Sequence, residues 1–167
     1  MSDRETIGLK SLIVHLLHRA VQEADAVFMQ HVGEDGPTPR QFAVLHTVAK
    51  KPNASQTRLA EMTGIDRSTL ADLVRRLVRQ GLLQRRRTKR DARAYAIRLS
   101  EKGRETLRVA SPAARRADAV ILSLLPAKQR NDVLTGLQTL VSALNERAEG
   151  AAGDLPPWIL RKNPKSP

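Results

Sequence analysis

A chain of 167 residues, 41% of them hydrophobic, is long enough to bury the core of one compact domain with helical extensions. It carries a formal net charge of +12 and contains no cysteine, which excludes disulfides, thiol redox sensing and cysteine-ligated zinc. No apolar run approaches the roughly 20 residues of a membrane span, and the N-terminus lacks a signal-peptide pattern, so we expect a cytoplasmic protein with no membrane partner.

The first predicted helix covers residues 7 to about 31. Its apolar residues recur at helical spacing and make a wide apolar face: Leu9, Leu12, Ile13, Leu16, Ala20, Ala24, Val27 and Phe28. One small domain would leave much of this face uncovered. We therefore expect residues 1–34 to form an N-terminal dimerisation helix.

Three shorter helices are predicted next. Thr38 is a good N-cap with Pro39 at the favoured first position, and Ser55 caps a third helix that Gly64 stops. Asp66 follows at once as the cap of the fourth helix. So tight a connection between two helices is typical of a helix-turn-helix.

The fourth helix, which Gly81 ends, is amphipathic. One side is an apolar stripe of Leu70, Leu73, Val74, Leu77 and Val78. The opposite side presents Ser68, Asp72, Arg75 and Arg79, flanked by Thr69 and Arg76. Short polar side chains near the N-terminus and long cations further along suit a helix that reads base edges and reaches phosphates.

Two strand-like runs follow, from Leu83 to Thr88 and from Tyr95 to Leu99, with Leu83, Tyr95, Ile97 and Leu99 expected to point inward. Residues 67–98 contain eleven basic and two acidic residues, or +9 of the total charge. Charge this dense is self-repulsive unless an anionic partner offsets it. The pattern therefore predicts a two-stranded basic wing that binds DNA.

Two long helices are predicted after the wing. Ser100 caps the first, in which Pro112 is expected to kink or interrupt the helix, and Pro126 opens the second. The second has a clear apolar stripe of Val133, Leu134, Leu137, Leu140, Val141 and Leu144. We expect residues 100–149 to form C-terminal dimerisation helices, because their apolar faces exceed what one wing domain can bury, and residues 150–167 to be an extended tail.

The run GIDRSTLADLVRRLVRQGLLQRRR, followed by Asp91 and Arg93 and by LSEKG at residues 99–103, resembles the MarR family of winged helix-turn-helix regulators. The resemblance is close over residues 38–107. It implies a mostly α fold: a winged helix-turn-helix domain at residues 38–99 with a two-stranded β wing, plus N- and C-terminal dimerisation helices. Two positions depart from the family pattern, Ala92 in the wing and Arg58 where glutamate is frequent.

The resemblance implies a homodimer on a pseudopalindromic DNA operator, with the fourth helix in the major groove and Arg93 in the minor groove, held by Asp91. The residues expected to contact DNA are Arg67, Ser68, Thr69, Asp72, Arg75, Arg76, Arg79, Arg86, Lys89, Arg90, Asp91 and Arg93. The function expected is that of a repressor released by a small organic ligand.

That ligand is expected in a cleft between the dimerisation helices and the winged domain. The candidate residues are His15, His18, Arg19, Arg40, Phe42 and His46. Imidazole, guanidinium and one ring suit an aromatic carboxylate, a phenol or an acyl-CoA thioester. Each histidine is also compatible with an ordinary surface or interface position. His15 and His18 are spaced to share a metal, but no acidic or cysteine cluster accompanies them, so no metal or other cofactor is expected.

Three alternatives remain at this point. A basic protein that coats DNA without sequence preference would also carry +12, although it would have no need of Asp72 on the DNA-facing side. A regulator without a ligand is equally compatible with the sequence, as are activators and repressors. Enzymatic readings lack a motif: there is no phosphate-binding glycine loop, HExxH or nucleophile elbow.

Overall fold

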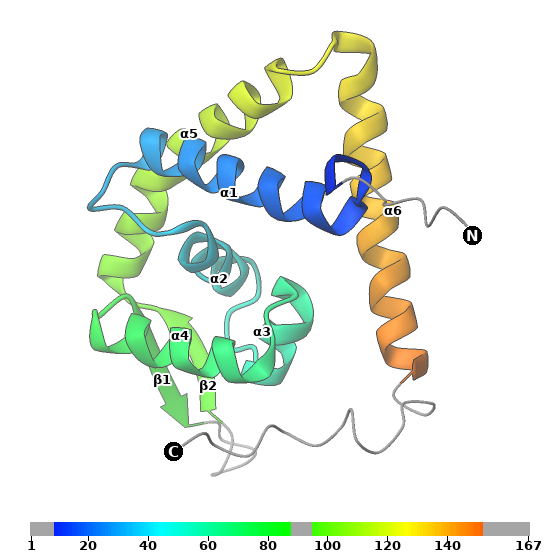
Figure 1. Cartoon of the computed structure of the whole chain (residues 1–167). Helices are drawn as coiled ribbons and strands as arrows, with labels where there is room; N and C mark the ends of the chain where they lie inside the picture. The colour runs from blue at the N-terminus through cyan, green and yellow to red at the C-terminus, as the bar shows by residue number, and fades with distance from the viewer. Residues whose placement is uncertain (1–8, 88–94, 152–167) are drawn as a thin grey trace, which may run out of the picture. The chain divides into compact units, whose positions relative to one another are not determined.

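The computed structural model of the chain (Figure 1) describes residues 9–87 and 95–151, and the side chains of these residues except 86, 87, 95 and 148–151. Its described part forms one 3-10 turn, six α-helices and two strands: η1 (Leu9–Ser11), α1 (Ile13–Val32), α2 (Pro39–Lys50), α3 (Gln56–Thr63), α4 (Arg67–Arg79), β1 (Leu83–Arg87), β2 (Tyr95–Leu99), α5 (Glu101–Ser123) and α6 (Ala127–Ala151). The chain divides into two compact units, Met1–Ile121 and Leu122–Pro167, which we describe separately.

The core of the first unit lies among α2, α3, α4 and the two strands (Figure 1). The predicted stripe of α4 faces it, since Leu70, Leu73, Val74 and Leu77 are all buried. The largest fully buried side chains of this core are Val44, Leu45, Val48, Leu59, Leu70, Val74, Leu77, Leu83 and Ile97. The winged helix-turn-helix expected from the sequence is thus confirmed.

The three short helices begin where their caps predict. The Thr38 hydroxyl accepts a hydrogen bond from the Gln41 N–H (3.3 Å) while the Thr38 N–H donates to Gln41 Oε1 (3.0 Å), a reciprocal capping box. The Ser55 hydroxyl accepts from the Arg58 N–H at 3.2 Å. Gly64, with φ of 66°, ends α3 in the left-handed region that favours glycine.

The end of α4 is also the predicted one. Gly81 has φ of 73°, its N–H donates to the Val78 carbonyl (3.0 Å), and the Leu82 N–H donates to the Leu77 carbonyl (2.9 Å). This pair of bonds is a Schellman motif. This motif reverses the direction of the chain sharply, and β1 begins directly after it at Leu83.

The wing strands are antiparallel, with Leu83 opposite Leu99 and Arg85 opposite Ile97. Leu83 and Ile97 are buried as predicted, and Leu99 is half-buried. The Asn53 N–H donates to the Ile97 carbonyl (3.0 Å), so that the α2–α3 connection covers the free edge of β2. Thr88, the end of the first predicted run, lies outside the described residues.

Three sequence-based boundaries need correction. Residues 9–11 form a 3-10 turn, and α1 begins only at Ile13, with Leu12 as an N-cap that offers no side-chain hydrogen bond. Secondly, α6 continues to Ala151 and includes the first two residues assigned to an extended tail. Thirdly, α5 continues through Pro112, so of the two expected effects the interruption does not occur. Residues 152–167 lie outside the described chain.

Packing explains why α5 continues through Pro112. A proline inside a helix costs about 3 kcal/mol or more through a lost hydrogen bond and a steric clash. Next to it, Ala114 and Ala117 are buried with Phe28 of α1 in a second apolar cluster. The apolar contact with α1 on this side holds the helix together, and the proline itself is exposed.

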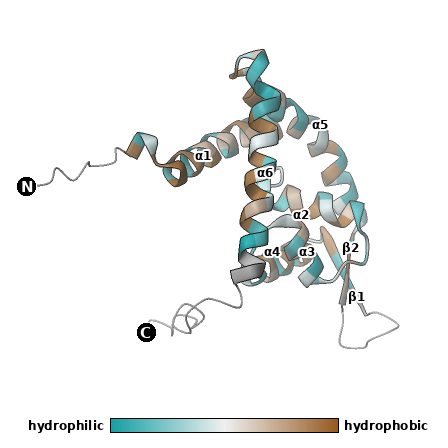
Figure 2. Cartoon of the chain, turned by 90° about the vertical axis from the view of Figure 1, so that its right-hand side faces the viewer, coloured by the Kyte–Doolittle hydropathy of each residue, from teal (hydrophilic) through white to brown (hydrophobic). Residues whose placement is uncertain are grey.

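Apolar side chains remain exposed on helices of both units. In the first unit, Ile13 and Val14 of α1 are 60% and 63% exposed; in the second, Val141 and Leu144 of α6 are 55% and 53% exposed. Figure 2 shows hydrophobic residues along both helices. Separately, no helix among the described residues is long and apolar enough to cross a membrane.

The α4 core packing predicts a matched pair of variants. Val74→Ala removes two methyl groups from a fully buried site, whereas Val109→Ala removes the same groups from a site that is 61% exposed on α5. We expect Val74→Ala to lower the free energy of unfolding by about 1.5–3 kcal/mol and Val109→Ala to change it by less than about 0.5 kcal/mol. Urea unfolding of both variants measures this difference; equal effects would contradict the core assignment.

Candidate nucleic-acid interface

The exposed side of α4 and the middle of β1 line an open basic hollow of about 700 Å³. The residues that line it are Asp72, Arg75, Arg76, Val78, Arg79 and Arg85. Four guanidinium groups therefore face one depression with a single carboxylate among them. We call this surface, together with the N-terminal turn of α4, the basic face.

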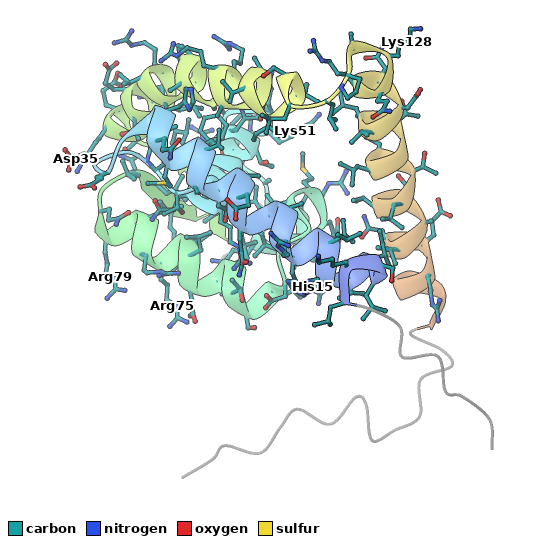
Figure 3. All side chains as sticks on the ribbon, turned by 45° about the horizontal axis from the view of Figure 1, so that its top comes forward. His15, Asp35, Lys51, Arg75, Arg79 and Lys128 are labelled. Carbon is teal, nitrogen blue, oxygen red and sulfur yellow. The ribbon has the colours of Figure 1, made fainter. Side chains whose placement is uncertain are left out.

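Two of these cations extend from the body of the protein. Figure 3 shows Arg75 and Arg79 projecting from the same side of α4, as expected for residues four apart. Asp72 pairs with Arg75, and both side chains are about 60% exposed (61% and 62%). An exposed pair of this kind contributes little to stability, so its constituents are available to an incoming partner.

The first turn of α4 carries the short polar side chains. The Asp66 carboxylate accepts hydrogen bonds from the Ser68 hydroxyl (2.6 Å) and from the Thr69 N–H (2.9 Å). These bonds hold the pKa of Asp66 well below its usual range, and the bond from Ser68 has the largest effect. The Ser68 proton is thereby committed to the cap, which leaves its oxygen lone pairs for a donor on a partner.

The structure brings most of the sequence-predicted DNA residues onto one surface. Arg67, Ser68, Asp72, Arg75, Arg76 and Arg79 are all exposed on α4, and Thr69 is half-buried. The side chain of Arg86, and Lys89, Arg90, Asp91 and Arg93 entirely, lie outside the described part of the chain. Their assignment remains a prediction from the sequence.

Sequence reasoning missed Arg85. It lies opposite Ile97 in the hairpin and on the same face as Leu83, yet it lines the basic hollow beside α4. The signal was present in the strand alternation, which assigns every second residue from Leu83 to the α4 side. The arginine at the second of these positions, Arg85, lines the hollow beside α4 together with residues of that helix.

The six candidate ligand residues lie on α1 and α2. Phe42 stacks on His46 (ring centroids 5.9 Å apart) and meets Phe28 edge-on at 5.6 Å. Arg40 lines a separate groove of about 400 Å³. Figure 3 shows His15 on the N-terminal half of α1, where His18 and Arg19 also lie. In the described ranges, no group of three or more His, Cys, Asp or Glu side chains could hold a metal.

The groove at Arg40 was not anticipated in this form. It lies between α1, α2 and the turn that precedes α4. The residues that line it are Val21, Asp25, Pro39, Arg40, Ala43, Thr63, Gly64, Ile65, Asp66 and Thr69. Val21 and Asp25 are the α1 residues here, rather than the histidines. Because Asp66 and Thr69 are the cap and first turn of α4, an occupant would touch the helix that carries the basic face.

Comparison with known proteins agrees with this architecture. The MarR family model matches residues 35–94. The HTH-type transcriptional repressor NicR of Pseudomonas putida is 29% identical over 141 residues, which cover 84% of this chain and 89% of NicR.

Two solved structures are also similar. The PcaV transcriptional regulator from Streptomyces coelicolor, in complex with its natural ligand, is 29% identical with a TM-score of 0.77, covering 86% of this chain and 99% of PcaV. The transcriptional repressor CouR, bound to a 23-mer DNA duplex, is 30% identical with a TM-score of 0.73, covering 84% of this chain and 99% of CouR. A second CouR structure holds p-coumaroyl-CoA.

The fold and its exposed basic helix define a winged helix-turn-helix regulator rather than an enzyme. The match to the family model and the similarity to CouR over nearly its whole length make the assignment specific. The chain belongs to the MarR family of transcriptional regulators.

The Asp66 cap predicts a pH dependence. A carboxylate whose pKa is lowered by folding stabilises the protein above its unfolded pKa, near 3.8, and loses that contribution as the pH falls toward the folded value. Asp66→Asn keeps an oxygen acceptor but cannot ionise. We therefore expect the melting temperature of wild type to exceed that of Asp66→Asn at pH 7, with the gap closing as the pH drops below about 4.

Thermal unfolding followed by circular dichroism between pH 3 and 7 measures this gap. Asp66→Ala, which has no cap at all, should melt below both proteins at every pH. A gap between wild type and Asp66→Asn that stays constant across this range would contradict the assigned cap.

Proposed function

We propose that the chain is a homodimeric repressor that binds a pseudopalindromic operator through the basic face and leaves it when a small aromatic acid or its thioester binds. The observation that carries this proposal is the basic hollow beside α4, with Arg75, Arg79 and Arg85 around it. A helix with this face fits the major groove, where the N-terminal turn approaches bases and the cations approach phosphates. CouR, a similar protein, has been solved on duplex DNA.

A homodimer would explain the exposed apolar faces of α1 and α6. Val14 and Val141 are examples of side chains that a second copy could cover. Two-fold symmetry then places two reading helices about one DNA turn, ~34 Å, apart. In this proposal residues 1–34 and 100–149 provide the dimer contacts and residues 38–99 bind the DNA.

The composition of the basic face favours sequence-specific binding over simple coating of DNA. Phosphate attraction alone needs only cations. Here Asp72 lies among the arginines and pairs with Arg75, and Ser68 offers an acceptor at the start of the helix. A carboxylate on the surface that approaches DNA lowers nonspecific affinity, and its use is to orient a guanidinium or to accept from a cytosine amino group.

Arg79 provides a direct test. The DNA is a duplex selected from random sequences by the wild-type protein, and binding is measured over a series of salt concentrations. We expect Arg79→Ala to weaken binding roughly tenfold and to reduce the salt slope by about 1, because one phosphate contact is lost. Arg115→Ala removes the same charge from an exposed site on α5 and should stay within about threefold of wild type.

Equal losses of affinity for the two variants would mean that net charge, and not the basic face, determines binding.

The wing is tested in the same assay with Arg93→Ala. For this variant the sequence predicts that the affinity for DNA falls tenfold or more, about 1.4 kcal/mol.

The effector proposal rests on the groove at Arg40. The guanidinium of Arg40 can pair with a carboxylate while Val21, Ala43 and Ile65 provide apolar contact for a ring. PcaV was solved with its natural ligand and CouR with p-coumaroyl-CoA, an aromatic acyl thioester. His15, His18, Arg19, Phe42 and His46 remain candidates for contacts that a larger ligand would make beyond the groove.

Release from DNA measures the effector response. The probes are benzoate, 4-hydroxybenzoate, phenol and p-coumaroyl-CoA, added to the complex with the selected duplex. If benzoate or 4-hydroxybenzoate releases wild type, we expect Arg40→Ala to need roughly tenfold more of that probe for half-release, about 1.4 kcal/mol, because the ion pair with the carboxylate is lost. Its affinity for DNA without a probe should stay close to that of wild type.

Arg40→Lys retains the charge but lacks the planar guanidinium. The probe concentration that it needs for half-release should lie between those of wild type and Arg40→Ala. An Arg40→Ala protein that responds like wild type would remove the groove from the proposal. Failure of all four probes on wild type would favour the regulator without an aromatic ligand.

A further inference from the structure

The end of the reading helix is tied to the beginning of α5 by Ser100. This side chain is 7% exposed. Its hydroxyl donates toward the carbonyls of Gly81 (2.5 Å) and Leu82 (3.1 Å) and accepts from the Gly103 N–H (2.9 Å). The Ser100 N–H also donates to the Leu82 carbonyl at 3.1 Å. One residue therefore caps α5 and holds the turn that ends α4.

Lys102 adds a charged contact to this connection. Its Nζ donates to the carbonyl of Gln80 at 3.1 Å, and Gln80 is the C-cap of α4. A cation at this position also interacts favourably with the negative end of the helix dipole. The carbonyls of three consecutive residues after α4 are thus bonded from the N-cap and the first turn of α5.

Gly103 brings the two segments into unusually close approach. A Cβ added to Gly103 would lie 2.0 Å from the Leu82 carbonyl oxygen and 3.0 Å from its carbon. Both contacts are with backbone, which cannot move aside as a flexible side chain could. Only glycine allows α5 to lie against the α4–β1 turn at this distance.

These contacts leave α4 little freedom relative to α5. A rotation or slide of one helix against the other would break these bonds, and the buried bond between Ser100 and the Leu82 carbonyl is the costliest to leave unpaired. We propose that Ser100, Lys102 and Gly103 are positioning residues that set the orientation of the reading helix and make it move together with α5. The inference rests on the proposed dimeric function, in which α5 contributes to the dimer contacts.

A purely structural role is the competing explanation, because a buried serine and a tight glycine also stabilise the fold. The two roles differ in what they change. Loss of stability alone reduces the fraction of folded protein and therefore weakens binding to every DNA by the same factor. Loss of positioning instead weakens the preference for one separation of the two half-sites, since each inserted base pair displaces a half-site by about 3.4 Å and rotates it by about 35°.

The experiment compares the selected duplex with the same duplex lengthened by one base pair between its half-sites. Wild type should prefer the original spacing by about tenfold or more. Lys102→Met keeps the aliphatic stem and loses the bond to Gln80, and we expect its preference to fall to about threefold or less. Lys128→Met is the control: it removes the same charge from an exposed lysine of α6, labelled in Figure 3, and should keep the wild-type preference.

Ser100→Ala and Ser100→Thr make the test independent of lysine. The alanine variant should lose the spacing preference and the threonine variant, which keeps the hydroxyl, should recover it. Circular dichroism at the assay temperature establishes that each protein is folded. Retained tenfold preference in folded Lys102→Met and Ser100→Ala would overturn the inference, whereas absence of any preferred sequence for wild type would instead overturn the proposed function.

Discussion

The burial of one side of α4 is the interaction on which the rest of the structure depends. Leu70, Leu73, Val74 and Leu77 are all in the core, and four such side chains contribute roughly 6–12 kcal/mol relative to exposure. That contribution offsets the mutual repulsion of the arginines on the opposite side. The apolar stripe and the basic face lie on opposite sides of one rigid helix. The core packing that stabilises the domain therefore also orients the arginines of the basic face.

Local chemistry explains which parts of the fold were predictable from the sequence. The caps at Thr38, Ser55 and Asp66 and the glycine turn at Gly81 depend on residues within one or two turns, and each was confirmed. The continuation of α5 through Pro112 was not predictable in this way. It depends on Ala114 and Ala117 packing against Phe28, some 90 residues earlier in the chain.

The candidate site shows the same division. The exposed residues of α4 follow from helical periodicity alone, since a face is defined by spacing. Arg85 required the strand alternation to be combined with the position of the hairpin beside α4. The groove at Arg40 required three segments to meet, Val21 and Asp25 from α1, Arg40 from α2 and Ile65 from the turn. Residue spacing along the sequence does not predict which distant segments come into contact. The histidines on α1 therefore suggested other residues than the two from α1 that line the groove.

In the proposed function, contacts at the two ends of α4 link ligand binding to DNA binding. The groove reaches its N-terminal cap, while Ser100 and Lys102 hold its C-terminal end. A ligand can shift the binding equilibrium only by preferring one arrangement of this helix over another. Contacts at both ends of α4 restrict the helix to few orientations, as a two-state switch requires.

Whether the basic face reads a DNA sequence is measured by selection from randomised duplex DNA at about 150 mM salt, because bare phosphate attraction is weakened there. A sequence-specific dimer should recover a pseudopalindrome whose half-sites are about one helical turn, ~34 Å, apart. Recovery of no motif, together with binding that collapses steeply as salt rises, would contradict sequence-specific binding and identify a protein that coats DNA without sequence preference.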